Sequence, residues 1–338
     1  MSPPRFDAFW AWWTYAGPRI AAAIDSRTVA GLVADISSHV KQLDSGLAWE
    51  LGPGRRSRHN LTLSPEGNIV LRRLTERWLG SAPPADETWE YYPARQPAPI
   101  LGLEIAGEKL DPTEWQFAVE VDEDRLLVNL TAHHPVLRRL PDRERPRAGF
   151  VALDQMFGED AVEKWLGALD FTTSKPRGAS SFNGVLRTIE RLSEDAKKEV
   201  FTLATGADES GHRLFLSFNQ RLKRLDHLFA ETRIQLDLRL RQPNQDGLTT
   251  DAEAEALNQL EDQLLAATAG AVYVGRLTGN GRRTMHFYAE DAPAALNGIA
   301  TCLAANPGWQ HGLRSDPDPE WAFYREGIYR AFARRASN

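Results

Sequence analysis

Two arginines and one glutamate near the C-terminus are the residues whose types and spacing could do chemistry. The dipeptide Asn280-Gly281 predicts a two-residue hairpin turn, because both residues tolerate a positive φ angle. In the hairpin expected at Ala271–Ala289, Arg276 and Arg283 then lie on one face, close to the turn. The same register places on that face Val272, Val274, Thr278, Met285, Phe287 and Ala289.

The element expected to cover this face is a helix at Asp251–Ala267. Leucines at positions 257, 260, 264 and 265 recur at helical spacing, and Glu261 falls within their apolar stripe. A carboxylate on a buried face needs a partner. We therefore expect Glu261 to pair with Arg276, with Arg283 as the second choice. Both a structural ion pair and a ligand- or partner-binding arginine fit this pattern.

The opposite face of the predicted hairpin is aromatic. The register places Tyr273 directly across from Tyr288, beside Gly275 and His286. Such a face is either covered by the rest of the chain or docks a partner. A slip of one residue would exchange the two faces.

The order of elements predicts an α+β fold with two domains. A strand at Glu231–Arg241, the helix, the hairpin and a second helix at Pro293–Ala304 give the succession β-α-β-β-α of a ferredoxin-like sandwich. The N-terminal half shows the succession α-β-β-α-β, so a similar plan is one interpretation of it. We expect an N-terminal domain at 1–174, a linker and connecting helix at 175–200, and the C-terminal domain at 201–338.

The sequence of 338 residues lacks the motifs of several classes of enzyme and metal site. The chain has no Gly-x-Ser-x-Gly, His-Glu-x-x-His or Gly-x-Gly-x-x-Gly motif. Cys302 is its single cysteine, and His133 and His134 are adjacent and so do not suit one metal ion. The net charge of −6 disfavours nucleic-acid binding. We therefore expect no cofactor and no metal, and a cytoplasmic location because no membrane span or signal peptide is visible.

A set of spaced motifs in the C-terminal half resembles one protein family. The motifs are Gly247-Leu-Thr-Thr, Leu260-Glu-Asp262, Val274-Gly-Arg276-Leu-Thr, Gly281, Arg283, Phe287-Tyr288 and Asp318-Pro-Glu-Trp321-Ala-Phe-Tyr324. Over about residues 201–332 the chain is similar to the bacterial domain-of-unknown-function family numbered 695, whose members occur alone or beside the regulator of ribonuclease activity B domain. The N-terminal half resembles the uncharacterised region that often precedes it. The resemblance implies a cytoplasmic bacterial module without an established activity or known catalytic residues.

Two hypotheses of function follow. The first is a non-enzymatic protein-interaction or regulatory module, with another protein as its partner. The alternative is an enzyme with a site between the two domains that uses Arg276, Arg283, Glu261 and Tyr288, since clefts form where domains meet. The sequence does not indicate the partner or the oligomeric state.

Overall fold

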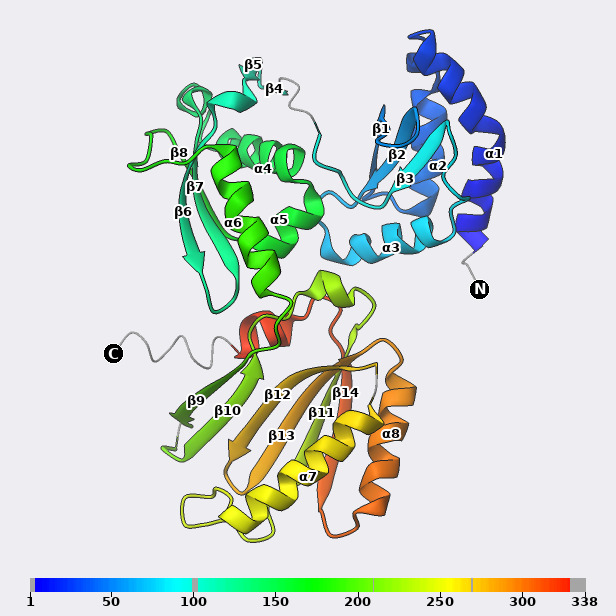
Figure 1. Ribbon diagram of the computed structural model, residues 1–338. Coiled ribbons are helices and arrows are strands. Elements are labelled where there is room, and N and C mark those ends of the chain that lie inside the picture. Colours follow the sequence, from blue (N-terminus) through cyan, green and yellow to red (C-terminus); the bar gives the residue numbers. More distant parts are fainter. Residues whose placement is uncertain (1–3, 99–102, 209, 269, 329–338) are drawn as a thin grey trace. The chain divides into compact units, whose positions relative to one another are not determined.

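The computed structural model describes residues 4–98, 103–208, 210–268 and 270–328 (Figure 1). The chain forms two compact units, Met1–Glu194 and Asp195–Asn338. Both units combine helices with sheets, which confirms the predicted α+β class. The domain limits expected from the sequence stay a prediction.

The first part of the N-terminal unit packs helices around a three-stranded sheet. Its elements are α1 (Pro4–Asp25), α2 (Val33–Leu43), β1 (Ala48–Pro53), β2 (His59–Ser64), α3 (Ile69–Gly80) and β3 (Trp89–Tyr92). Aromatic side chains recur at helical spacing on α1, so Phe6, Phe9 and Trp13 are all buried. They join Trp78 of α3 and Trp89 of β3 in one core cluster.

The second part of this unit contains another three-stranded sheet. Its elements are β4 (Leu103–Ile105), β5 (Glu108–Leu110), β6 (Gln116–Asp122), β7 (Leu127–His133), α4 (Glu144–Phe157), α5 (Glu159–Trp165), β8 (Leu166–Thr172) and α6 (Phe182–Asp195). Strand β7 is antiparallel to β6 and parallel to β8, as β2 is antiparallel to β1 and parallel to β3. The N-terminal unit therefore has small mixed sheets among its described residues.

The C-terminal unit instead contains one antiparallel sheet. Its elements are β9 (Phe201–Ala207), β10 (Arg213–Asn219), β11 (Thr232–Arg239), α7 (Asp251–Ala267), β12 (Val272–Gly279), β13 (Arg282–Ala289), α8 (Ala292–Ala305), β14 (His311–Pro317) and a short π-helix (Phe323–Ile328). The six strands lie in the order β14-β11-β13-β12-β10-β9. The predicted succession β-α-β-β-α is present in β11, α7, β12, β13 and α8. Its assignment to the ferredoxin-like folds stays a prediction, and the similar plan suggested for the N-terminal half does not match the mixed sheets found there.

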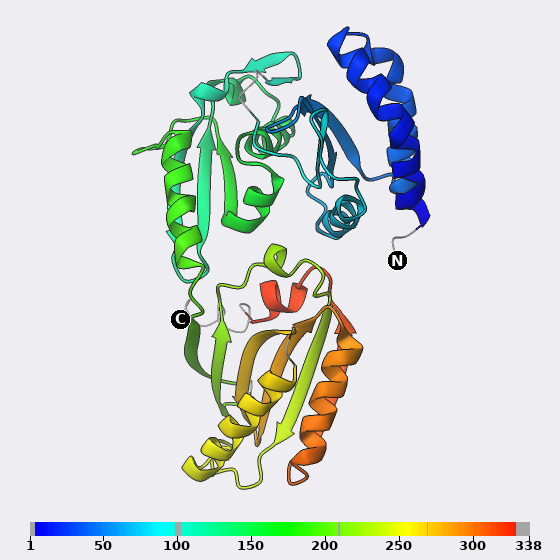
Figure 2. The same cartoon turned by 45° about the vertical axis from the view of Figure 1, so that its right-hand side comes forward.

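Both α-helices of the C-terminal unit, α7 and α8, cover the same face of its sheet (Figures 1 and 2). Leu257, Leu260 and Leu264 of α7 are buried against inward-facing residues of β11 and β13. The leucine stripe predicted from the sequence is therefore the face of α7 that packs on the sheet. Glu261 lies on this face and so contacts the sheet. None of the helices among the described residues combines the length and the apolar character needed to cross a membrane.

Candidate functional site

The hairpin β12–β13 has the turn that Asn280-Gly281 predicts. Both residues have positive φ angles, 51° at Asn280 and 69° at Gly281. Next to the turn, Arg276 pairs with Met285 and Thr278 pairs with Arg283, as the predicted register requires. Paired residues share a face of a sheet, and this face is the one that α7 covers.

The structure brings Glu261, Arg276 and Arg283 together beneath α7. Arg276 Nη1 donates to Glu261 Oε2 at 2.5 Å, and Arg283 Nη1 donates to the same oxygen at 3.1 Å. Glu261 Oε1 accepts from the hydroxyl of Tyr273 at 2.8 Å. Asn258, one turn before Glu261, accepts from Arg283 Nη1 at 3.0 Å and from Arg276 Nη1 at 3.4 Å. We call these five residues the arginine cluster.

Burial and charge act strongly on this cluster. Arg283 and Glu261 are only 4% and 6% exposed. Burial, followed by the positive charge of Arg276, lowers the pKa of Arg283. Burial, followed by the negative charge of Glu261, raises the pKa of Tyr273, which keeps its hydroxyl proton. The cluster thus holds two guanidinium groups and one carboxylate, and its net charge is positive.

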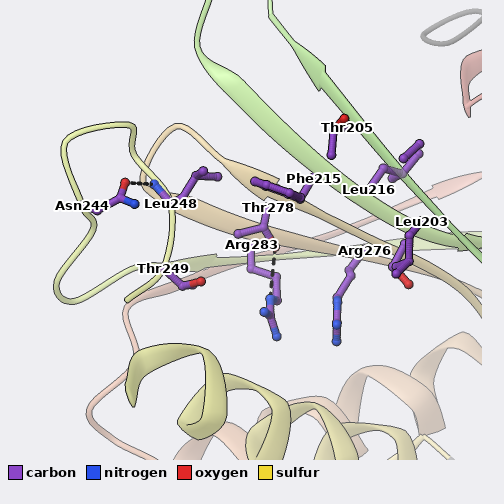
Figure 3. Close-up of a pocket in the computed structure, with 12 residues that line it drawn as sticks. Leu203, Thr205, Phe215, Leu216, Asn244, Leu248, Thr249, Arg276, Thr278 and Arg283 are labelled. Carbon is purple, nitrogen blue, oxygen red and sulfur yellow. Dashed lines mark hydrogen bonds between the residues drawn. The ribbon is translucent and has the colours of Figure 1, made fainter. Parts of the chain in front are cut away.

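A cavity of about 600 Å³ opens above the cluster (Figure 3). Arg276 and Arg283 extend side by side from the strands toward the helix, and Thr278 Oγ1 accepts from Arg283 Nε at 3.3 Å. Hydroxyl-bearing and apolar side chains from β9, β10 and the loop before α7 also line the cavity, among them Leu203, Thr205, Phe215, Ser217, Leu248 and Thr249. The loop is tied to the hairpin turn, because Gly247 O accepts from Gly281 N at 2.8 Å.

The predicted aromatic face is wrong in one respect, because β12 contains a bulge. The register shifts between Tyr273 and Gly275, so Tyr273 pairs with Phe287 and Val272 pairs with Tyr288. Gly275 has a φ angle of 147°, and a Cβ there would collide with the backbone of β10. Tyr273 therefore lies on the helix-covered face with Glu261, while Val274 packs with Tyr288 on the other face.

The C-terminal segment covers Tyr288 and His286. The Tyr288 ring stacks on Trp321 with centroids 4.2 Å apart, and its hydroxyl donates to Asp318 Oδ2 at 2.5 Å. The His286 ring lies 4.4 Å from that of Phe323. Tyr288 is fully buried on the face opposite the arginine cluster, so it cannot share one site with Arg276, Arg283 and Glu261. The four-residue enzyme site considered from the sequence is therefore wrong.

The helix-side face of β9 and β10 carries apolar side chains that neither helix covers. Leu203 is 79% exposed, Phe215 42% and Phe201 38%. Leu203 pairs with Ser217, which pairs with Arg276, so these residues share the face of the arginine cluster. Arg213 lies at the end of this face, with its guanidinium 5.9 Å from the Phe215 ring centroid. Phe201, Leu203, Arg213 and Phe215 together form what we call the β9–β10 surface.

A second charged cluster, in the N-terminal unit, was missed by the sequence analysis. Arg95 contacts Glu50 at 2.6 Å, Glu66 at 2.8 Å, Asp154 at 3.8 Å and Glu159 at 3.9 Å. Burial, followed by the charge of Glu159, raises the pKa of Asp154 to about 6. We call these five residues the Arg95 cluster. No sequence spacing could have revealed it, since its members come from β1, the turn after β2, the segment after β3, α4 and α5.

The described residues contain no group of three or more His, Cys, Asp or Glu side chains arranged to hold a metal ion. The adjacent histidines bind backbone atoms instead. His134 Nε2 lies 2.8 Å from Asp111 O, and His133 Nδ1 lies 3.1 Å from Thr172 O.

Comparison with known proteins bears on the C-terminal unit alone. No curated protein and no solved structure matches the chain. No family matches the N-terminal half, so the resemblance expected there has no support. The resemblance predicted for the C-terminal half is confirmed. Residues 210–329, which include the whole arginine cluster, match the family described as a family of unknown function (DUF695).

Proposed function

We propose that the protein is a non-enzymatic interaction or regulatory module, and that its β9–β10 surface docks an amphipathic helix of a partner protein. The observation that carries this proposal is the exposure of Leu203, Phe201 and Phe215 on a sheet face that helices cover elsewhere. Apolar side chains gathered at one exposed site are typical of protein-interaction surfaces.

The spacing of the sheet favours a helix as the partner. Packed helices lie 8–10 Å apart, which is about two strand spacings of 4.8 Å. Helices α7 and α8 together are therefore wide enough to cover four strands, β14, β11, β13 and β12. The remaining pair, β10 and β9, has the width for a third helix on the same face.

The charges of the two sheet edges also differ. Strand β14, at one edge, carries Arg314 and Asp316. Strand β9 has no charged residue. Beside it, Arg213 has no carboxylate partner among the residues that the structure describes, so we expect an acidic residue on the docking helix near Arg213.

A photo-crosslinking amino acid placed at position 203 of the full chain tests this proposal in cell extract. We expect one major crosslinked partner, with the crosslink in an amphipathic helical segment that carries acidic residues. Leu203→Asp should lower capture of that partner at least about tenfold, because it removes a central apolar contact. It should leave stability within about 0.5 kcal/mol, since the side chain is exposed.

Tyr15 offers a matched control. Its side chain is 78% exposed, as Leu203 is 79% exposed, but it belongs to α1. Tyr15→Asp should leave capture unchanged. Equal capture by the Leu203 and Tyr15 variants would refute docking at the β9–β10 surface.

A further inference from the structure

We infer that the cavity above the arginine cluster binds a small organic anion with one carboxylate group and an apolar body. This inference goes beyond partner docking, because it concerns a soluble ligand in a cavity of the C-terminal unit. It rests on the charge of the cluster, its free hydrogen-bond donors and the lining of the cavity.

The charge of the cluster calls for one more anion. The guanidinium groups of Arg276 and Arg283 share a single carboxylate oxygen, Glu261 Oε2. Arg283 is almost completely buried, so water does little to screen its charge. Arginine does not lose its proton in proteins, so the excess charge persists at every physiological pH. One bound carboxylate would make the cluster neutral, whereas a doubly charged phosphate would overcompensate it.

The cluster also has donors to offer. Both arginines make their contacts with Glu261 and Asn258 through Nη1. The Nη2 atoms of both side chains, and Nε of Arg276, have no partner among the described residues. Both arginines line the cavity side by side (Figure 3). Guanidinium donors in such an arrangement suit the two oxygens of a carboxylate.

The lining of the cavity indicates the rest of the ligand. Its volume of about 600 Å³ lies within the range of small-molecule sites. Leu203, Phe215 and Leu248 supply apolar walls, and the hydroxyl groups of Ser217 and Thr249 add polar contacts. Apolar walls favour an organic body over a bare inorganic ion.

Titration of the purified full-length protein tests the inference without any partner protein. Hexanoate and benzoate serve as probes, with hexanamide and benzamide as neutral analogues of the same shape, and inorganic phosphate as a further arm. Isothermal titration calorimetry should show saturable binding of a carboxylate and much weaker binding of its amide. Arg276→Gln should weaken carboxylate binding about ten- to a hundredfold, as expected for the loss of charge-assisted hydrogen bonds.

Arg233→Gln provides the matched control. The Arg233 side chain is 20% exposed and that of Arg276 is 28% exposed, but Arg233 pairs with Asp316 on the opposite face of the sheet. Circular dichroism and the melting temperature establish that both variants fold. The inference is overturned by equal binding of acid and amide, by binding of phosphate alone, by unchanged affinity in folded Arg276→Gln, or by binding of none of the probes. Because no partner enters the assay, these outcomes leave the docking proposal to its own test.

Discussion

The arginine cluster and the Arg95 cluster contain the same kinds of charged group in opposite proportions. In the C-terminal unit, two arginines share one carboxylate. In the N-terminal unit, one arginine lies among four carboxylates at distances from 2.6 to 3.9 Å. One cluster therefore has an excess of positive charge and the other an excess of negative charge.

The difference shows two ways of relieving an excess charge. A carboxylate can take up a proton, and the pKa of Asp154, raised to about 6, brings this within reach of neutral pH. Arginine cannot release its proton, so the C-terminal cluster has no such route. An anion from outside can balance this excess, as proposed above, and both arginines line a cavity that has room for one.

Removing a carboxylate from each cluster tests this comparison most strongly. Glu261→Gln leaves a buried Arg283 beside Arg276 without any anion, so we expect a loss of about 3–5 kcal/mol in the free energy of unfolding. Glu50→Gln removes one of four carboxylates from Arg95 and should cost less than about 1 kcal/mol. Amide hydrogen exchange in the full chain measures both effects, one in each unit.

Adding Arg283→Met to Glu261→Gln should recover part of the loss, because the buried charge is removed together with its partner. Equal effects of Glu261→Gln and Glu50→Gln would break the distinction between the two clusters.

The pH dependence of the C-terminal unit provides a second test. Burial, followed by the positive charge of Arg233, lowers the pKa of His286 to about 4. The unfolded chain binds this proton near pH 6.5, so between pH 4 and 6.5 the unfolded state holds more protons than the folded state. Stability should therefore fall as the pH is lowered through this window, by roughly 3 kcal/mol at its lower end.

His286→Leu should remove this pH dependence, as measured by hydrogen exchange of amides in β11–β13 between pH 7 and pH 4.5. A wild-type C-terminal unit with constant stability over that range would contradict a neutral, buried His286.

The parts of the site that could be predicted depend on local rules. The turn at Asn280-Gly281 determines which residues pair next to it, and the leucine stripe of α7 determines that Glu261 faces the sheet. These two patterns were enough to bring Glu261, Arg276 and Arg283 together. The bulge lies farther from the turn, and there the prediction of the aromatic face fails. Gly275 within a strand was the available signal, because glycine in a strand interior often marks a bulge.

Other features depend on tertiary structure, which local patterns do not encode. Strands β9 and β10 join the sheet beside β12 and leave one face uncovered, which no local pattern in the sequence indicates. The Arg95 cluster assembles residues from position 50 to position 159, without a spacing that a motif could capture.

Asp154 offers the last test, in which the N-terminal unit should respond to pH in the opposite sense. With a pKa of about 6 in the folded state and about 3.9 in the unfolded state, the folded state binds this proton first as the pH falls. The stability of the unit should therefore decrease as the pH rises from about 4 to about 6. At pH 7 the charged form costs roughly 2–3 kcal/mol, and Asp154→Asn should recover most of it. Hydrogen exchange of amides in α4 measures the change, with Asp7→Asn at an exposed position of α1 as the control. A loss of stability in Asp154→Asn at pH 7 would mean that Arg95 needs all four carboxylates, and that the N-terminal cluster has no excess of negative charge to relieve.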